Sequence, residues 1–115
     1  MDKNYWESIN KRQYVYWSGI CHEERISAIN HIEECINNFG FVMDYKFFSD
    51  FSMSMIIEIE ERKMENLYHD LAKIIALSGY DKFDAESTKE CTILLSISFT
   101  KGTGNLKIEV PAVPG

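Results

Sequence analysis

Cysteine and histidine side chains are the first candidates for chemistry in this sequence. Cys21 and His22 are adjacent, and Cys-His catalysis needs an imidazole within hydrogen-bond reach of the thiolate. Neighbouring residues of a strand point to opposite faces, so we interpret this pair as ordinary residues at a strand end. His31 and Cys35 lie four residues apart on one face of a predicted helix, but a zinc site takes three or four ligands. We therefore predict no metal, no cofactor and no catalytic residue.

Two further site patterns are incomplete. The acidic residues of the loop before the last long strand lack the spacing and the glycine of a calcium-binding loop: Asp81, Asp84 and Glu86. Tyr14, Tyr16 and Trp17 resemble the stacking aromatics of RNA-binding sheets, but the basic-Gly-aromatic run of such sheets is missing. The net charge of -6 also opposes binding to phosphates. We expect no nucleic-acid partner.

Composition predicts one globular domain of 115 residues, with an arm at 1–12 and a loose tail at 111–115. The chain is 45% hydrophobic and 26% charged, and no apolar run approaches the roughly 18 residues that a membrane span needs. Its start does not resemble a secretory signal, so we expect a cytoplasmic protein without a membrane partner. The cysteines, odd in number, are expected to be reduced thiols: Cys21, Cys35 and Cys91.

A hairpin of two alternating strands, residues 41–49 and 51–60, is the predicted centre of the fold. Burying a large apolar side chain gains roughly 1.5 to 3 kcal/mol, whereas burying an unpaired Asp44 or Lys46 costs several kcal/mol. We therefore predict that the inward set of the first strand is Phe41, Met43, Tyr45 and Phe47. The inward set of the second strand is Phe51, Met53, Met55, Ile57 and Ile59.

The remaining pattern predicts further strands and two helices around this hairpin. Strands are expected at 13–21, 91–100 and 106–110, and helices at 23–38 and 62–78, with Gly40 and Gly79 after the helix ends. This order predicts an α+β, ferredoxin-like βαββαβ sandwich, with an antiparallel sheet, both helices on one face and an added C-terminal hairpin strand. The other face of the sheet is left uncovered.

Within this fold, residues 21–60 resemble the ACT domain, which shows Asp-Arg-Pro-Gly followed by aliphatic residues and a later glycine. The corresponding residues here are Glu24, Arg25, Ile26 and Ser27, then Ala28, Ile29, Ile32 and Ile36, and Gly40. The aliphatic spacing agrees with the family, and the signature is incomplete because Ser27 stands in place of the glycine. The resemblance implies a regulatory module that dimerises and binds an amino acid or another small ligand.

A ligand site is predicted where the first helix begins. A helix N-terminus offers free N-H groups to a carboxylate, which is the physical reason to expect binding there. The candidate ligand-binding residues are Cys21, His22, Glu24, Arg25 and Ser27.

An interface is predicted on the uncovered face of the sheet. Apolar residues that fall on the polar side of the strands should gather there, together with some of Tyr14, Tyr16 or Trp17: Val42, Phe48, Ile56 and Leu94. A contiguous exposed apolar patch commonly meets a partner. We therefore expect a homodimer, joined by sheet face or by sheet edge.

Three functions agree with these patterns. The first is a non-catalytic, dimeric regulatory module that binds a small molecule such as an amino acid. The second is an acidic module that binds a basic protein through Glu58, Glu60, Glu61 and the loop acids. The third is a dimeric enzyme with a cavity between sheet and helices, because such a cavity needs no motif.

Overall fold

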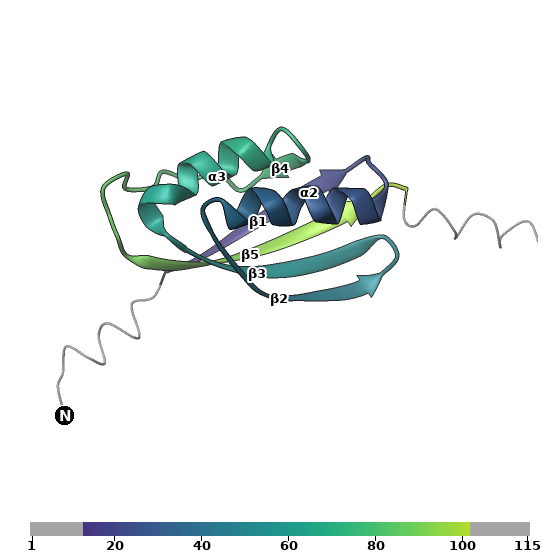
Figure 1. The fold of residues 1–115 in the computed structure, drawn as a ribbon, viewed down its shortest axis with the longest axis horizontal. Helices are drawn as coiled ribbons and strands as arrows, with labels where there is room; N and C mark the ends of the chain where they lie inside the picture. The colour runs from purple at the N-terminus through teal and green to yellow at the C-terminus, as the bar shows by residue number, and fades with distance from the viewer. Residues whose placement is uncertain (1–12, 102–115) are drawn as a thin grey trace, which may run out of the picture.

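A computed structural model describes residues 13–101 as a curved five-stranded sheet with two helices (Figure 1). The strands are β1 (Gln13–Cys21), β2 (Gly40–Ser49), β3 (Ser52–Glu60), β4 (Ala76–Ser78) and β5 (Glu90–Phe99). The helices are α2 (Arg25–Asn37) and α3 (Met64–Leu71), the latter preceded by a short 3-10 helix, η1 (Glu61–Lys63). The predicted arm 1–12, last strand 106–110 and tail 111–115 lie outside the described residues.

The strand order is β2-β3-β5-β1-β4, and β1 and β5 run parallel while the other neighbours run antiparallel. The predicted α+β class is confirmed, but the sheet is mixed and does not have the simple antiparallel βαββαβ arrangement. The physical reason is the placement of β4. It pairs with the outer edge of β1, where a ferredoxin-like fold puts its last strand, and β5 lies between β3 and β1.

The core lies between the sheet and the helices, and it follows the alternation of β3 and β5. All five alternate residues of β5 that face the helices are almost fully buried: Cys91, Ile93, Leu95, Ile97 and Phe99. The predicted inward set of β3 is confirmed for Met53, Met55, Ile57 and Ile59. Phe51, at the turn, is exposed instead. Trp17 of β1 is also a core residue, with 1% of its surface exposed.

The predicted inward set of β2 is wrong for Phe41 and Met43, because the strand contains a β-bulge at Met43. Val42 pairs with Ile57 and Asp44 pairs with Ile56, so Met43 is an extra residue without a partner on β3. The residues of β2 that precede it therefore point to the faces opposite to those predicted. Phe41 and Met43 are 70% and 58% exposed. Val42, which was expected on the uncovered face, packs against the core instead.

Tyr45 and Phe47 keep the predicted side of β2 but not the predicted burial. They lie opposite Met55 and Met53, whose side chains face the helices, and are 47% and 43% exposed. Since β2 is the outermost strand, the core covers these rings only in part.

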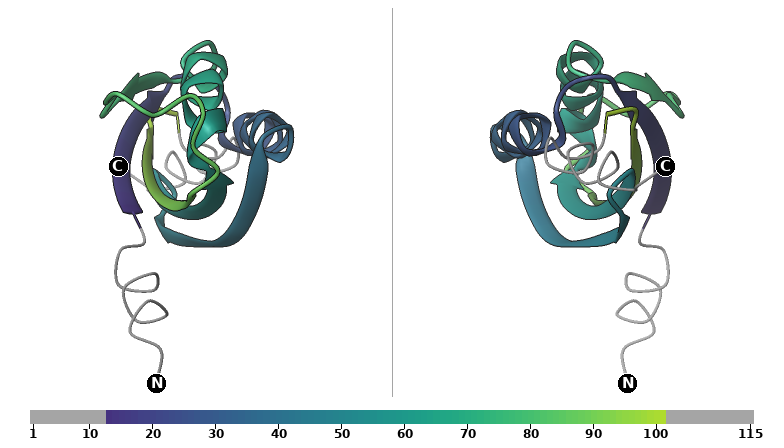
Figure 2. Two further views of the ribbon diagram at one scale, coloured as in Figure 1. Left: turned by 90° about the vertical axis from the view of Figure 1, so that its left-hand side faces the viewer. Right: turned by 90° about the vertical axis from the view of Figure 1, so that its right-hand side faces the viewer.

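Both helices cover the same face of the sheet, which curves around them (Figure 2). The buried residues of α2 are Ala28, Ile32, Cys35 and Ile36, and those of α3 are Met64, Leu67 and Leu71. Both helices are shorter than predicted. Gly40 begins β2 rather than capping α2, and Asn38 is the C-cap residue.

The second helix ends at Leu71 although the apolar period continues beyond it. The N-H groups of Ile74 and Ile75 both donate to the carbonyl of Leu71, and the chain then forms β4 against β1. Gly79 follows with φ of 109°, and a Cβ there would lie 2.6 Å from the carbonyl oxygen of Tyr16. Only glycine fits this turn without strain, so Gly79 ends the strand rather than the helix.

Candidate functional site

The predicted ligand site at the start of α2 is already filled by a side chain of the same helix. Glu24 is the N-cap residue, and its carboxylate accepts hydrogen bonds from the N-H groups of Ile26 at 2.9 Å and Ser27 at 3.1 Å. These bonds hold the pKa of Glu24 below its usual value of 4.5. A ligand carboxylate would have to displace Glu24 to reach these groups.

Arg25 ties the start of α2 to the β2–β3 turn. Its guanidinium lies 3.2 Å from the Asp50 carboxylate and 3.5 Å from the carbonyl oxygen of Ser49. The same group lies 4.3 Å from the centre of the Phe47 ring. The contacts of Arg25 are therefore those of a residue that fixes the position of the helix against β2.

Cys21 and His22 lie in different surroundings. Cys21 is buried, and burial, with the nearby Glu23 carboxylate, raises the pKa of its thiol despite a backbone contact to Glu23. Nδ1 of His22 lies 3.2 Å from the hydroxyl of Thr100 on the neighbouring strand end. A thiol of this kind is a poor nucleophile at neutral pH, because the thiolate is the reactive form. Three predicted residues, Glu24, Arg25 and Ser27, do lie together, but in helix capping and docking contacts.

The uncovered face of the sheet carries an aromatic and aliphatic groove near one end. The strand pairing places Asp44, Ile56, Leu94 and Tyr16 side by side across four strands. The groove encloses about 240 Å³ and is lined by Tyr14, Val15, Tyr16, Ile56, Thr92 and Leu94. Ile56 and Leu94 are thus on the predicted face, and the flanking Tyr14 and Tyr16 rings are well exposed.

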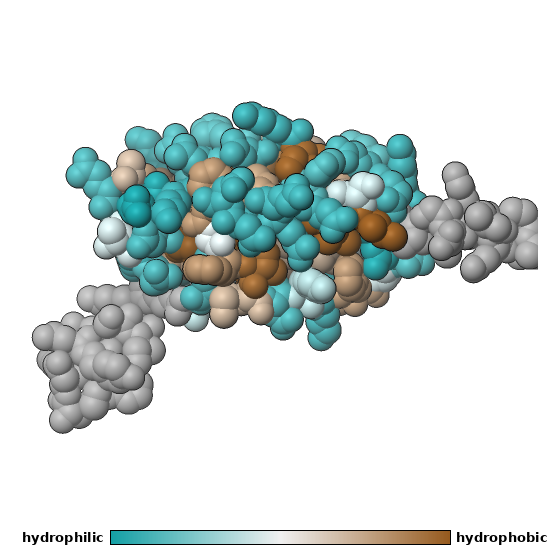
Figure 3. Space-filling view, viewed as in Figure 1, coloured by the Kyte–Doolittle hydropathy of each residue, from teal (hydrophilic) through white to brown (hydrophobic). Residues whose placement is uncertain are grey.

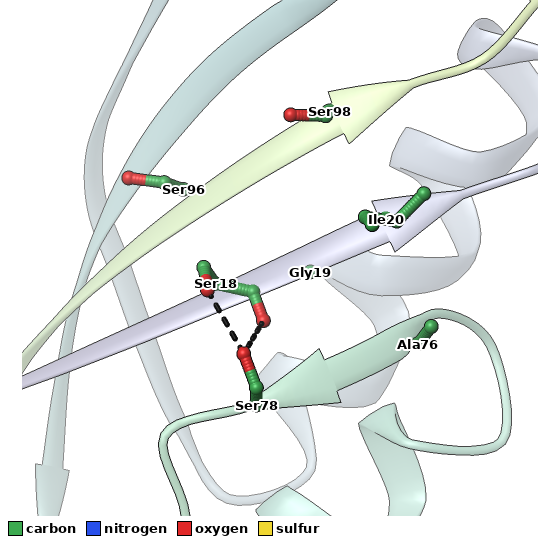
Figure 4. Close-up of a pocket in the computed structure, with 7 residues that line it drawn as sticks. All are labelled: Ser18, Gly19, Ile20, Ala76, Ser78, Ser96 and Ser98. Atoms are coloured by element: carbon green, nitrogen blue, oxygen red, sulfur yellow. Dashed lines mark hydrogen bonds between the residues drawn. The ribbon is translucent and has the colours of Figure 1, made fainter.

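Hydroxyl groups occupy the next part of the same face. A depression of about 300 Å³ is lined by Ser18, Gly19, Ile20, Ala76, Ser78, Ser96 and Ser98 (Figure 4). The hydroxyls of Ser18 and Ser78 lie 3.0 Å apart across β1 and β4. Among residues 13–101, no histidine, carboxylate or amine lines this depression beside the serines.

Exposed hydrophobic side chains are most concentrated on β2. Five of them belong to this strand: Phe41, Met43, Tyr45, Phe47 and Phe48. Tan side chains lie along the lower edge of the molecule in Figure 3, between hydrophilic ones, where Figure 1 places β2. The predicted interface residue Phe48 shares the side of Lys46, whose amine lies 5.9 Å from its ring. We call this strand with its exposed side chains the β2 edge.

Sequence reasoning missed Phe41 and Met43 as surface residues. The bulge that redirects β2 has no marker in the sequence, since neither glycine nor proline stands at Met43.

Comparison with known proteins found no match for this chain. No family model, no curated protein and no solved structure matches it. Among residues 13–101, no three His, Cys, Asp or Glu side chains are grouped so that they could hold a metal ion. In the same part of the chain, neither helix has the length and apolar character that crossing a bilayer requires.

The cap at Glu24 predicts a pH-dependent contribution to stability. Because the folded pKa of Glu24 lies below the unfolded value of 4.5, the cap stabilises the fold above that pH and is lost as the pH falls below it. We expect Glu24→Ala to lower the urea midpoint at about pH 7, and the difference from the unsubstituted chain to shrink towards about pH 3.

The matched control is Glu34→Ala, which removes an exposed carboxylate from the same helix and keeps the cap. Urea titrations of both variants at several pH values make the comparison. An equal effect of the two substitutions at every pH would contradict the capping role.

Proposed function

We propose that this chain is a non-catalytic regulatory module that acts as a homodimer. One observation carries the proposal: an outer strand exposes five large hydrophobic side chains, Phe41, Met43, Tyr45, Phe47 and Phe48. Exposed apolar surface of this kind is typical of protein interaction sites. An outer strand with unpaired backbone groups also invites pairing with another chain.

The groups that could do chemistry support binding over catalysis. The Cys21 thiol is buried with a raised pKa, and the serine hydroxyls of the uncovered face have no base among the residues beside them. The space between sheet and helices, where an enzyme cavity was an alternative, is filled by side chains such as Trp17, Ile32 and Leu95. The exposed surfaces, above all β2 with its hydrophobic side chains, are therefore the features on which the proposal is based.

A small carboxylate ligand, such as an amino acid, is the second part of the proposal. Glu24 shows that the N-H groups of Ile26 and Ser27 hold a carboxylate in good geometry. A ligand carboxylate that binds there replaces the carboxylate of Glu24 and accepts the same hydrogen bonds from the first turn of α2. The start of α2 also contacts the β2–β3 turn through Arg25, which connects this position to the β2 edge.

Sedimentation of the full chain tests the homodimer. Between about 1 and 100 µM we expect the mass to rise from that of one chain, 13.4 kDa, towards twice that value. Burial of the exposed hydrophobic side chains is the physical reason. A constant mass of one chain across this range would contradict the proposal.

Thermal unfolding in the presence of free amino acids tests the ligand. At about millimolar concentration we expect at least one amino acid to raise the unfolding temperature of the full chain. The rise should be larger in Glu24→Ala, because this variant vacates the N-H groups without altering them. If no amino acid stabilises either protein, the ligand part of the proposal is wrong.

A further inference from the structure

We propose that two copies join by antiparallel pairing of their β2 strands about a twofold axis beside Tyr45. In this arrangement Asp44 of each copy pairs with Lys46 of the other. The inference rests on the proposed homodimer and specifies which surface makes it and in which register.

The strand order leaves β2 available for this pairing. Within the described residues β2 pairs with β3 alone and forms one end of the sheet. A twofold axis relates identical surfaces, so residue i of one copy meets residue j of the other and the reverse. Two copies of an outer strand related in this way run antiparallel, and their sheets become continuous.

The charges on β2 select the register. Asp44 lies opposite Ile56 and Lys46 opposite Ser54, so both charged side chains are on the uncovered face. When Tyr45 faces Tyr45 of the second copy, Asp44 falls opposite Lys46 twice. A shift of the axis to Asp44 or to Lys46 places like charges opposite each other, which destabilises a strand pair. A strand with Asp-Tyr-Lys at its centre is thus complementary to itself.

The Tyr45 backbone, at the centre of the proposed pairing, can exchange a hydrogen bond within one copy for a hydrogen bond to the second copy. The N-H group of Tyr45 donates to the carboxylate of Asp44 at 2.8 Å in the single copy. In the dimer this carboxylate turns to Lys46 of the second copy, and the Tyr45 N-H donates to the carbonyl of Tyr45 across the axis. The Tyr45 N-H and the Asp44 carboxylate therefore each exchange one partner for another.

The exposed hydrophobic side chains add contact area on the helix side. The rings of Tyr45 and Phe47 lie 5.6 Å apart and are only half covered in the single copy. The pairing brings Tyr45 against Tyr45 of the second copy on this side, with Phe47 next to it on the same strand. Burying such side chains is the main favourable contribution to association.

The opposite end of the sheet does not offer the same surface. There β4 has three residues, Ala76–Ser78, and its exposed side chains are small. Bulges near Met43 and Phe48 also limit the regular part of β2 to a few residues. Pairing therefore closes as a dimer and does not propagate into a fibre.

Charge reversal in the full chain tests the register. We expect Asp44→Lys and Lys46→Asp each to weaken the dimer about tenfold, because each places like charges opposite each other twice. The double variant Asp44→Lys/Lys46→Asp restores the opposite pairs and should return to within about twofold of the original dissociation constant. An equimolar mixture of the two single variants should form a heterodimer, since their charges are complementary.

The control is Glu34→Lys, a similar reversal on an exposed position of α2, which should leave the dissociation constant unchanged. If the chain dimerises but the single reversals have no effect, the register is wrong and the homodimer stands. If the double variant or the mixture fails to recover, the register is also wrong. A chain that stays monomeric overturns both the register and the homodimer.

Disulfide cross-linking tests the same register without altering the charge of the strand. Opposed residues in an antiparallel pair have Cα atoms about 4.5 to 5.5 Å apart, which a disulfide can bridge. Tyr45→Cys should therefore give a covalent dimer on mild oxidation, whereas Tyr16→Cys on the uncovered face should not. The native cysteines are buried and do not compete. Cross-linking through Tyr16→Cys in place of Tyr45→Cys would contradict the inference.

Discussion

The position of β5 between β3 and β1 is the constraint on which the rest of the structure depends. This strand pairs along its whole length on both sides, antiparallel to β3 and parallel to β1. Its five helix-facing residues are almost fully buried, so it contributes the centre of the core. Because β5 is the last described strand, the sheet is complete only when distant parts of the chain have come together.

The uncovered surfaces follow from that arrangement. Within residues 13–101, two short helices cover the middle of the sheet on one face, and they do not cover the opposite face or most of the outer strand β2. Arg25 holds α2 against the β2–β3 turn, so the β2 edge keeps its position although the core covers it only in part. The proposed dimer and the proposed ligand therefore meet at neighbouring parts of the same molecule.

The alternation of side chains within a strand predicted some elements correctly. Pairing between strands that are distant in the sequence determined the elements that were predicted wrongly. The bounds of β1 and the buried sets of β3 and β5 agree with strict alternation. Ile74 and Ile75 continue a helical period, so β4 was not predicted; its pairing with residues 18–20 outweighs that preference. The bulge at Met43 changed the faces of β2, and the Glu24 side chain filled the predicted ligand site. Ile56 and Leu94 were placed on the uncovered face because they break the alternation of their strands.

Hydrogen exchange at two protein concentrations tests the role of the β2 edge most directly. The Tyr45 amide and its neighbours on β2 should exchange more slowly at about 100 µM than at about 1 µM, because a second copy pairs with them. The amides of β4 at the other edge should exchange at the same rate at both concentrations. Equal exchange of the β2 amides at both concentrations would contradict the account.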